Sequence, residues 1–147
     1  MAQVTASTER TIAAPVDRVR AALADYAATR PNLLTEQFSE YEVREGGVGA
    51  GTVVHWKLAA TSKRTRDCLL TVTEPVEGQL VETDANSSMV TTWTANPAGE
   101  TSSTVSVVTS WTGATGVGGF FERTFAPRGL NRIYTGILTN LDAAVTC

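Results

Sequence analysis

The sequence FFERTFAPRGLNRIYTGILTNLDAAV, residues 120–145, is the longest helical pattern in the chain and decides its architecture. Its apolar residues recur every three or four positions, which places them on one side of an α-helix. They are Phe120, Phe121, Phe125, Leu130, Ile133, Tyr134, Ile137, Leu138, Leu141 and Val145. Pro127 and the glycine-rich residues 113–119 mark where this helix should bend or split. We predict a long C-terminal helix whose apolar side must be covered.

The pattern of residues 36–112 is typical of β-strands. Runs of Thr, Val, Ser, Tyr and Trp are separated by Gly, Pro and Asn. The short connections favour antiparallel pairing of each strand with the next. The predicted strands cover residues 37–45, 52–60, 65–74, 79–85, 88–96 and 102–112. Alternating β-branched residues at 2–13 predict a further strand before them, which makes about seven in all.

Two short helices are expected after the first strand. Pro15 suits the first position of a helix, where its missing N–H needs no partner. Apolar residues then follow at helical spacing, namely Val16, Val19, Leu23 and Tyr26. The pair Arg30-Pro31 should interrupt this helix, because a residue before proline disfavours the α conformation. Leu33 and Leu34 would belong to a second short helix or turn.

This order of elements predicts an α+β fold, formed as a single domain over residues 1–147. A sheet of about seven strands twists strongly and can curl around the last helix, the one apolar element long enough to cover it. The two short helices would close one end. Such a half-barrel tends to leave a cavity between sheet and helix, where small molecules bind.

Alternation within the strands predicts which side chains face that helix. Lys57 cannot be buried cheaply without a partner, so Lys57, His55 and Val53 should point outward. The inward set would be Val54, Trp56, Leu58, Cys68, Leu70, Val72, Trp93, Val105, Val107, Thr109 and Trp111.

Glu82 and Asp84 share one face of their strand, and the pattern leaves its orientation open. Facing the helix, a buried carboxylate would have a raised pKa suited to acid–base chemistry. Facing outward, both would be ordinary solvated carboxylates, and we expect this orientation. The other candidates for proton transfer are Arg66, Tyr41 and Tyr134.

Composition excludes several classes of function. The 147 residues are 42% apolar and 18% charged, and the net charge is −3. A nucleic-acid-binding surface needs a dense basic stripe, whereas Lys63, Arg64 and Arg66 alone fit a solvated hairpin. No run is long and apolar enough for a membrane span, and no secretory signal is visible. We expect a cytoplasmic protein whose Cys68 and Cys147 are reduced thiols, although a disulfide is possible.

No cofactor or metal is expected. His55, the single histidine, should lie on the outer face, and with two distant cysteines it forms no metal-ligand cluster. The glycines at 46–51 precede a strand rather than a helix, so they do not form a phosphate-binding loop. The glycines at 113–119 lack the lysine and hydroxyl residue of such a loop.

Five segments in order resemble the polyketide cyclase/dehydrase-type members of the START-like superfamily, also called SRPBCC or Bet v 1-like. They are IAAPVDRVRAALADY (12–26), GTVVHWKL (51–58), TVTEPVEGQLVE (71–82), SSMVTTWTANPAGETSSTVSVVTSWTG (87–113) and FFERTFAPRGLNRIYTGILTNLDAA (120–144). The resemblance covers nearly the whole chain, and the style is similar to small actinobacterial members. It implies the helix-grip fold with a deep ligand cavity, but it does not name a reaction.

The leading functional hypothesis is a non-catalytic binder or carrier of an apolar small molecule, such as a lipid, isoprenoid or polyketide. The alternatives are a cyclase or dehydratase acting on a polyketide-like substrate, and a protein-interaction module. The oligomeric state, monomer or dimer, is left open. The predicted cavity lining is Val54, Trp56, Leu58, Leu70, Trp93, Val107, Trp111, Phe121, Phe125, Leu130, Tyr134, Ile137 and Leu138.

Overall fold

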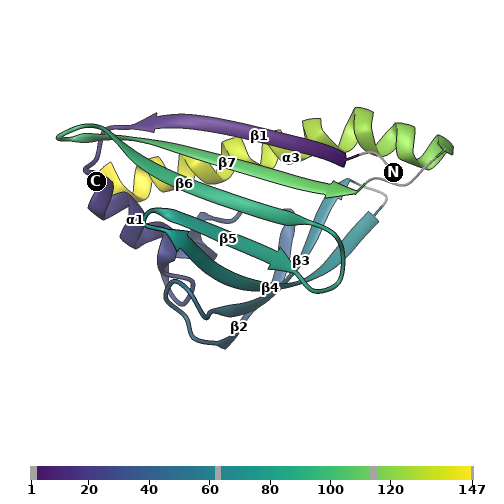
Figure 1. The fold of residues 1–147 in the computed structure, drawn as a ribbon, viewed down its shortest axis with the longest axis horizontal. Helices are drawn as coiled ribbons and strands as arrows, with labels where there is room; N and C mark the ends of the chain where they lie inside the picture. The colour runs from purple at the N-terminus through teal and green to yellow at the C-terminus, as the bar shows by residue number, and fades with distance from the viewer. Residues whose placement is uncertain (1–2, 62–63, 113–115, 147) are drawn as a thin grey trace.

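The computed structural model describes residues 3–61, 64–112 and 116–146, with side chains described except at 3, 60, 61, 64 and 116–127. Its elements follow the predicted order (Figure 1). They are β1 (Gln3–Ile12), α1 (Val16–Ala24), α2 (Thr29–Leu33), β2 (Phe38–Glu45), β3 (Val53–Thr61), β4 (Arg64–Val76), β5 (Gln79–Asp84), β6 (Val90–Gly99), β7 (Ser102–Thr112) and α3 (Gly116–Thr146).

The strands form one curved antiparallel sheet in the order β1-β7-β6-β5-β4-β3-β2. Consecutive strands from β2 to β7 are neighbours, and β1 joins the free edge of β7. The long helix α3 runs along one face of this sheet, and α1 lies beside the C-terminal end of α3 (Figure 1). The predicted fold class, a helix-grip fold with a seven-stranded sheet, is confirmed.

The apolar stripe of α3 is buried against the sheet as predicted, from Leu130 to Val145. Polar contacts beside the stripe hold the helix in register. Arg10 of β1 forms an ion pair with Asp142 at 2.8 Å, and the Asn140 side-chain amide donates to the Leu33 carbonyl at 2.8 Å. These contacts tie α3 to β1 on one side and to α2 on the other.

The first helix ends earlier than predicted, at Ala24, and Arg30 and Pro31 lie inside α2. The turn forms at Asp25, whose carboxylate accepts hydrogen bonds from the backbone N–H groups of Ala28 and Thr29 at 3.1 and 3.3 Å. Pro31 is tolerated because it stands in the first turn of α2, where backbone N–H groups have no partner within the helix.

The last helix is longer than its apolar stripe and continues through Pro127 for 31 residues in all. The expectation that Pro127 splits off the first turns is therefore wrong, because one missing backbone hydrogen bond does not end a helix of this length. Residues 116–119, part of the glycine-rich stretch expected to mark a bend or split, are the first residues of the helix, and 113–115 lie outside the described residues.

Candidate functional site

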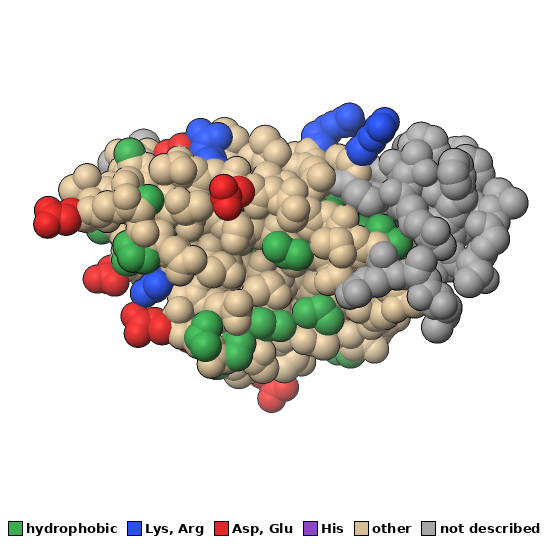
Figure 2. Space-filling view, turned by 45° about the horizontal axis from the view of Figure 1, so that its top comes forward, with side chains coloured by type: hydrophobic (Ala, Val, Ile, Leu, Met, Phe, Trp, Pro, Cys, Tyr) green, Lys and Arg blue, Asp and Glu red, His purple; other side chains and the backbone are tan. Residues whose placement is uncertain are grey.

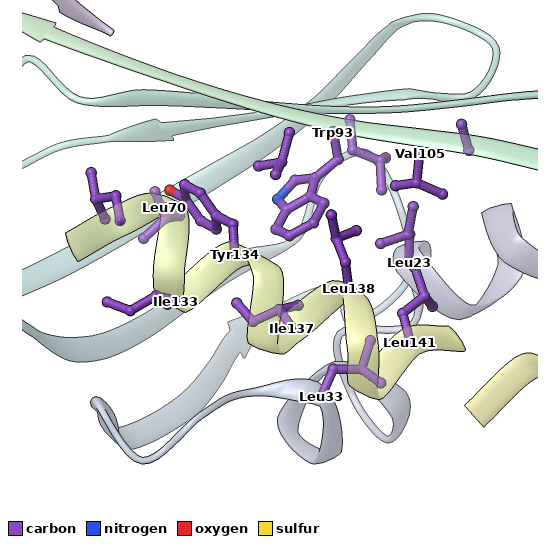
Figure 3. Packing of buried hydrophobic residues seen from close by; sticks show 14 of the residues in the cluster. Leu23, Leu33, Leu70, Trp93, Val105, Ile133, Tyr134, Ile137, Leu138 and Leu141 are labelled. Atoms are coloured by element: carbon purple, nitrogen blue, oxygen red, sulfur yellow. The ribbon is translucent and has the colours of Figure 1, made fainter. Parts of the chain in front are cut away.

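The predicted cavity-lining side chains point from sheet and helix into the same interior. The eleven that are described are all buried: Val54, Trp56, Leu58, Leu70, Trp93, Val107, Trp111, Leu130, Tyr134, Ile137 and Leu138. Figure 3 shows Trp93 and Leu70 of the sheet facing Tyr134, Ile137 and Leu138 of α3. The side chains of Phe121 and Phe125 lie outside the described residues. The inward orientation is confirmed, whereas a role in ligand binding stays a prediction.

The preferred outward orientation of Glu82 and Asp84 is wrong. Both carboxylates are buried, with exposed fractions of 2% and 6%. The reason is the register of β5, in which Leu80 pairs with the inward-facing Trp93. Because side chains alternate along a strand, Leu80, Glu82 and Asp84 share the inner face. Burying a charge requires partners, and the structure provides them for both residues.

Glu82 receives hydrogen bonds from the α1–α2 turn, from α2 and from β6. The Tyr26 hydroxyl donates to its Oε2 at 2.5 Å, and the Arg30 guanidinium donates to the same atom and forms a buried ion pair. The indole N–H of Trp93 donates to Oε1 at 3.1 Å. Both carboxylate oxygens are therefore occupied by protein donors.

The guanidinium of Arg30 is equally enclosed. It lies 4.6 Å from the ring centre of Tyr26 and 4.7 Å from that of Trp93, and its Nε donates to the Leu23 carbonyl at 2.8 Å. Burial by itself would lower the pKa of Arg30, but the adjacent Glu82 carboxylate acts together with Tyr26 and Tyr41 to outweigh burial and keep that pKa raised. Burial has the opposite effect on Tyr26 and raises the pKa of its hydroxyl, because it disfavours the charged phenolate. Arg30 is thus a fixed cation.

The edge strand β2 helps to hold this cluster. Its register shifts between Ser39 and Glu42, and Glu40 adopts a positive φ of 53° inside this bulge. Tyr41 then turns inward, where its ring stacks on Trp56 at 6.0 Å and its hydroxyl donates to the Tyr26 carbonyl at 2.6 Å. A bulge redirects the side chains of its strand, so this one brings Tyr41 to the turn between α1 and α2.

A second buried polar group lies farther along the sheet. The hydroxyls of Thr91 and Thr109 are 2.9 Å apart, and Thr109 also bonds to the Tyr134 hydroxyl. Burial raises the pKa of Tyr134 to about 12. The Tyr134 ring meets Trp93 edge to face at 5.8 Å, as Figure 3 shows. This hydroxyl cluster is neutral and contacts the Arg30–Glu82 cluster through Trp93.

Asp84 stabilises the turn after β5 rather than joining either cluster. Its Oδ1 accepts from the backbone N–H groups of Leu69 and Asn86 at 3.0 and 3.1 Å, and its Oδ2 accepts from the Ser87 hydroxyl at 2.7 Å. These three donors satisfy the carboxylate within its own loop and the neighbouring strand. The burial of the Asp84 carboxylate is therefore explained by its structural role in this turn.

The remaining candidates are distributed over strands β3 and β4. His55 is on the outer face, as predicted, where its ring nitrogens contact the Glu40 carbonyl at 3.0 Å and the Asp67 carboxylate at 2.6 Å. Cys68 is a buried free thiol, and burial raises its pKa to about 12. Arg66 is half-buried on β4. Of the polar candidates named from the sequence, Tyr41, Tyr134 and Glu82 contribute to the two interior clusters.

Neither a metal centre nor a membrane span emerges from the described residues. No group of three or more His, Cys, Asp and Glu side chains there could hold a metal ion. None of the described helices has the length and hydropathy that a transmembrane segment requires. On the face drawn in Figure 2, charged side chains of both signs are scattered among the coloured residues without a dense basic patch.

The sequence of nearly the whole chain, residues 1–146, matches the family model described as polyketide cyclase / dehydrase and lipid transport. The chain belongs to this family. Membership agrees with the resemblance inferred from the five sequence segments. No curated protein matches the chain at a significant level.

Several solved structures are similar to the chain over nearly its whole length. The KanY protein (ms6282), determined by NMR in solution, is 50% identical with a TM-score of 0.90, and the match covers 100% of both chains. The Zhui aromatase/cyclase from Streptomyces sp. R1128 has a TM-score of 0.77 at 14% identity, over 98% of this chain and 94% of that one. A START superfamily protein from Mycobacterium smegmatis has a TM-score of 0.69 at 13% identity, over 96% of both chains. The last two likenesses concern the fold alone.

Sequence reasoning did not predict that Arg30 and Tyr26 are buried partners of Glu82. Arg30 was interpreted as part of a helix break, and Tyr26 only as part of an apolar stripe. One signal was available: Leu80 shares its face with Glu82, which favours an inward carboxylate. A buried carboxylate would then have required a buried cation, and Arg30 lies among apolar residues. Thr91 and Thr109 carried no signal beyond strand alternation.

Proposed function

We propose that this protein binds an apolar small molecule between the inner face of the sheet and α3, and carries it without transforming it. Family membership supports the ligand class, since the family description includes lipid transport. The buried side chains that face one another across this interior are mostly aliphatic and aromatic. A ligand with little polar surface would gain most from contact with them.

One observation carries the proposal: the buried charges inside the described part of the chain are paired with one another. Glu82 is held by Tyr26, Arg30 and Trp93, and Asp84 by its own loop. A general base needs to reach a proton of the substrate. A carboxylate whose two oxygens already accept protein hydrogen bonds is poorly placed for that step.

A cyclase or dehydratase is the second candidate, and the Arg30–Glu82 pair is the observation that favours it. The pair lies beside aromatic rings in the interior, and a ligand that displaced Tyr26 would expose a carboxylate next to a cation. The family description also includes cyclase and dehydrase members.

The interaction-module alternative requires a contiguous exposed apolar patch. Among the described side chains, the exposed large hydrophobic residues are Val48, Val76 and Val108, which belong to three separate segments. Because of this distribution, the interaction-module hypothesis has the least support of the three functional hypotheses.

The experiment that tests the proposal combines native mass spectrometry with displacement of an apolar fluorescent dye. We expect the purified protein to bind the dye and to release it to fatty acids, isoprenoids or aromatic polyketides. Any molecule recovered from the complex should keep its mass. The absence of displaceable binding across this panel would refute a carrier, while loss of water from a bound polyketone would establish the enzyme instead.

A further inference from the structure

The indole N–H of Trp111 is a buried hydrogen-bond donor without an acceptor. The Trp111 side chain is 5% exposed, and among the described atoms nothing accepts from its Nε1. Trp93, also on the inner face, provides the contrast, because its Nε1 donates to Glu82 at 3.1 Å. Buried donors in native proteins are nearly always paired, so an unpaired one needs an explanation, and a bound molecule that accepts the hydrogen bond would be one.

The position of Trp111 indicates what kind of partner could reach it. Trp111 lies on the inner face of β7, two residues beyond Thr109, which places the two side chains about 7 Å apart along the strand. Its strand neighbour on β1 is Val4, which is also buried. An acceptor for Trp111 would therefore enter from the interior between sheet and α3, near the Thr91–Thr109–Tyr134 hydroxyl cluster.

The acceptor should be neutral. The buried charged side chains of the described residues are Arg30, Glu82 and Asp84, and each already has its partners. No buried cation there is left to balance an anionic ligand, and an unbalanced charge in this interior would be costly. The acceptor must therefore bond to the Trp111 N–H and carry no charge. A carbonyl oxygen on an otherwise apolar molecule meets both conditions.

We propose that Trp111 is a specificity residue whose indole N–H donates a hydrogen bond to a neutral carbonyl oxygen of the bound molecule. The inference rests on the proposed function and refines it, from apolar small molecules in general to apolar ketones or quinones. The Trp111 donor distinguishes a ketone from the corresponding hydrocarbon, because only the ketone supplies an oxygen that accepts a hydrogen bond from the indole N–H.

The test uses matched pairs in which one CH2 group of the hydrocarbon is replaced by a carbonyl: indane and 1-indanone, fluorene and 9-fluorenone, 9,10-dihydroanthracene and anthrone. Affinities are measured by dye displacement on the full chain. We expect at least one ketone to bind about three- to tenfold more tightly than its hydrocarbon, the range expected for one added hydrogen bond. The Trp111→Phe variant should still bind both members of that pair but lose the preference.

A second measurement uses the wild-type protein alone and does not depend on whether a variant folds. In a ¹H–¹⁵N NMR spectrum of the wild-type protein, the bound ketone should move the indole proton of Trp111 downfield, and its hydrocarbon partner should not. The indole signal of Trp93, already bonded to Glu82, is the internal control and should stay in place.

The outcomes separate the two proposals. Equal affinity for ketone and hydrocarbon in all three pairs, with an unmoved Trp111 signal, would overturn the role of Trp111 and leave the carrier function standing. Tighter binding of 9-fluorenecarboxylate than of 9-fluorenone would overturn the inference that the ligand's acceptor group is neutral. Failure of every apolar probe and of the dye to bind would overturn the carrier function itself, and the inference with it.

Discussion

Arg30 of α2 and Glu82 of β5 form a buried ion pair across 52 positions of the chain, with both side chains at most 3% exposed. The pair joins α2 to β5, the middle strand of the sheet. Its energetic role differs from that of a surface salt bridge, because each charge is withdrawn from water and depends on the other.

Removal of one partner should therefore destabilise the protein strongly. We expect Arg30→Met or Glu82→Met to lower the free energy of unfolding by about 3–5 kcal/mol, since each leaves a buried charge without its partner. The double variant Arg30→Met with Glu82→Met should recover much of this loss. Urea denaturation of the three variants measures the coupling, and additive losses in the double variant would contradict a paired role.

The exposed ion pair between Arg44 and Glu42 is the matched control for this cycle. Its side chains are 47% and 64% exposed. Pairs of this kind contribute little, because water screens the charges and two flexible side chains must be ordered. Replacing either residue by alanine should leave the unfolding midpoint almost unchanged.

Gly136 marks the closest approach of α3 to the segment after α2. A Cβ atom at this position would lie 2.8 Å from Cγ2 of Thr35. We expect Gly136→Ala to destabilise the protein by about 1–3 kcal/mol, as overpacking does. In a Thr35→Ala background the same change should stabilise it, because alanine favours the helix by up to about 1 kcal/mol. Thermal unfolding of the four proteins tests this reversal of sign.

The chain contains three tyrosines, and all three should resist ionisation while the protein is folded. Burial raises the pKa of Tyr134 to about 12 and raises those of Tyr26 and Tyr41 as well. A folded-state pKa above the unfolded value of about 10 means that stability is complete below about pH 10 and falls as pH rises beyond it. Absorbance near 295 nm should therefore show little tyrosinate until the protein unfolds.

The unfolded chain in urea is the control for this titration and should ionise near pH 10. A separate tyrosinate signal near that pH in the folded protein, with unchanged far-ultraviolet circular dichroism, would show that one of the rings is accessible. Single Tyr→Phe variants would then identify it.

Asp67 on the outer face should contribute to stability only above acidic pH. Its hydrogen bond from His55 lowers the pKa of the carboxyl below its ordinary value. A depressed folded-state pKa gives stability that is present above the unfolded value of about 3.9 and is lost as pH falls through the folded value. The difference in stability between wild type and Asp67→Asn should thus shrink below about pH 4. A constant difference would contradict the His55–Asp67 interaction.

Much of the fold could be predicted because it depends on local patterns. The strands from Val53 to Thr112 lie within a few residues of their predicted bounds, and the side chains expected to face inward, such as Val54 and Trp93, are buried. Alternation determines these faces, because a strand with one buried side must place its apolar residues there. The turn at Asp25 was missed, because it depends on side-chain hydrogen bonds to backbone rather than on hydropathy.

The candidate site was predicted in part. The aliphatic and aromatic lining follows from amphipathicity, and its described members are buried. The unpaired indole of Trp111 and the paired indole of Trp93 could not be distinguished, since both are strand tryptophans with the same alternation. Which of them has an acceptor depends on where Glu82 meets the neighbouring strand.

The sequence by itself determined the order of elements, the inner face of most strands and the apolar side of α3, because periodicity of hydrophobic residues is read along the chain. Only the tertiary structure decided that Arg30 and Glu82 are buried together, that Tyr41 reaches the turn at Tyr26, and that Trp111 lacks an acceptor. The physical reason is that the cost of burying a polar group depends on the partner it meets, and these partners come from distant parts of the chain.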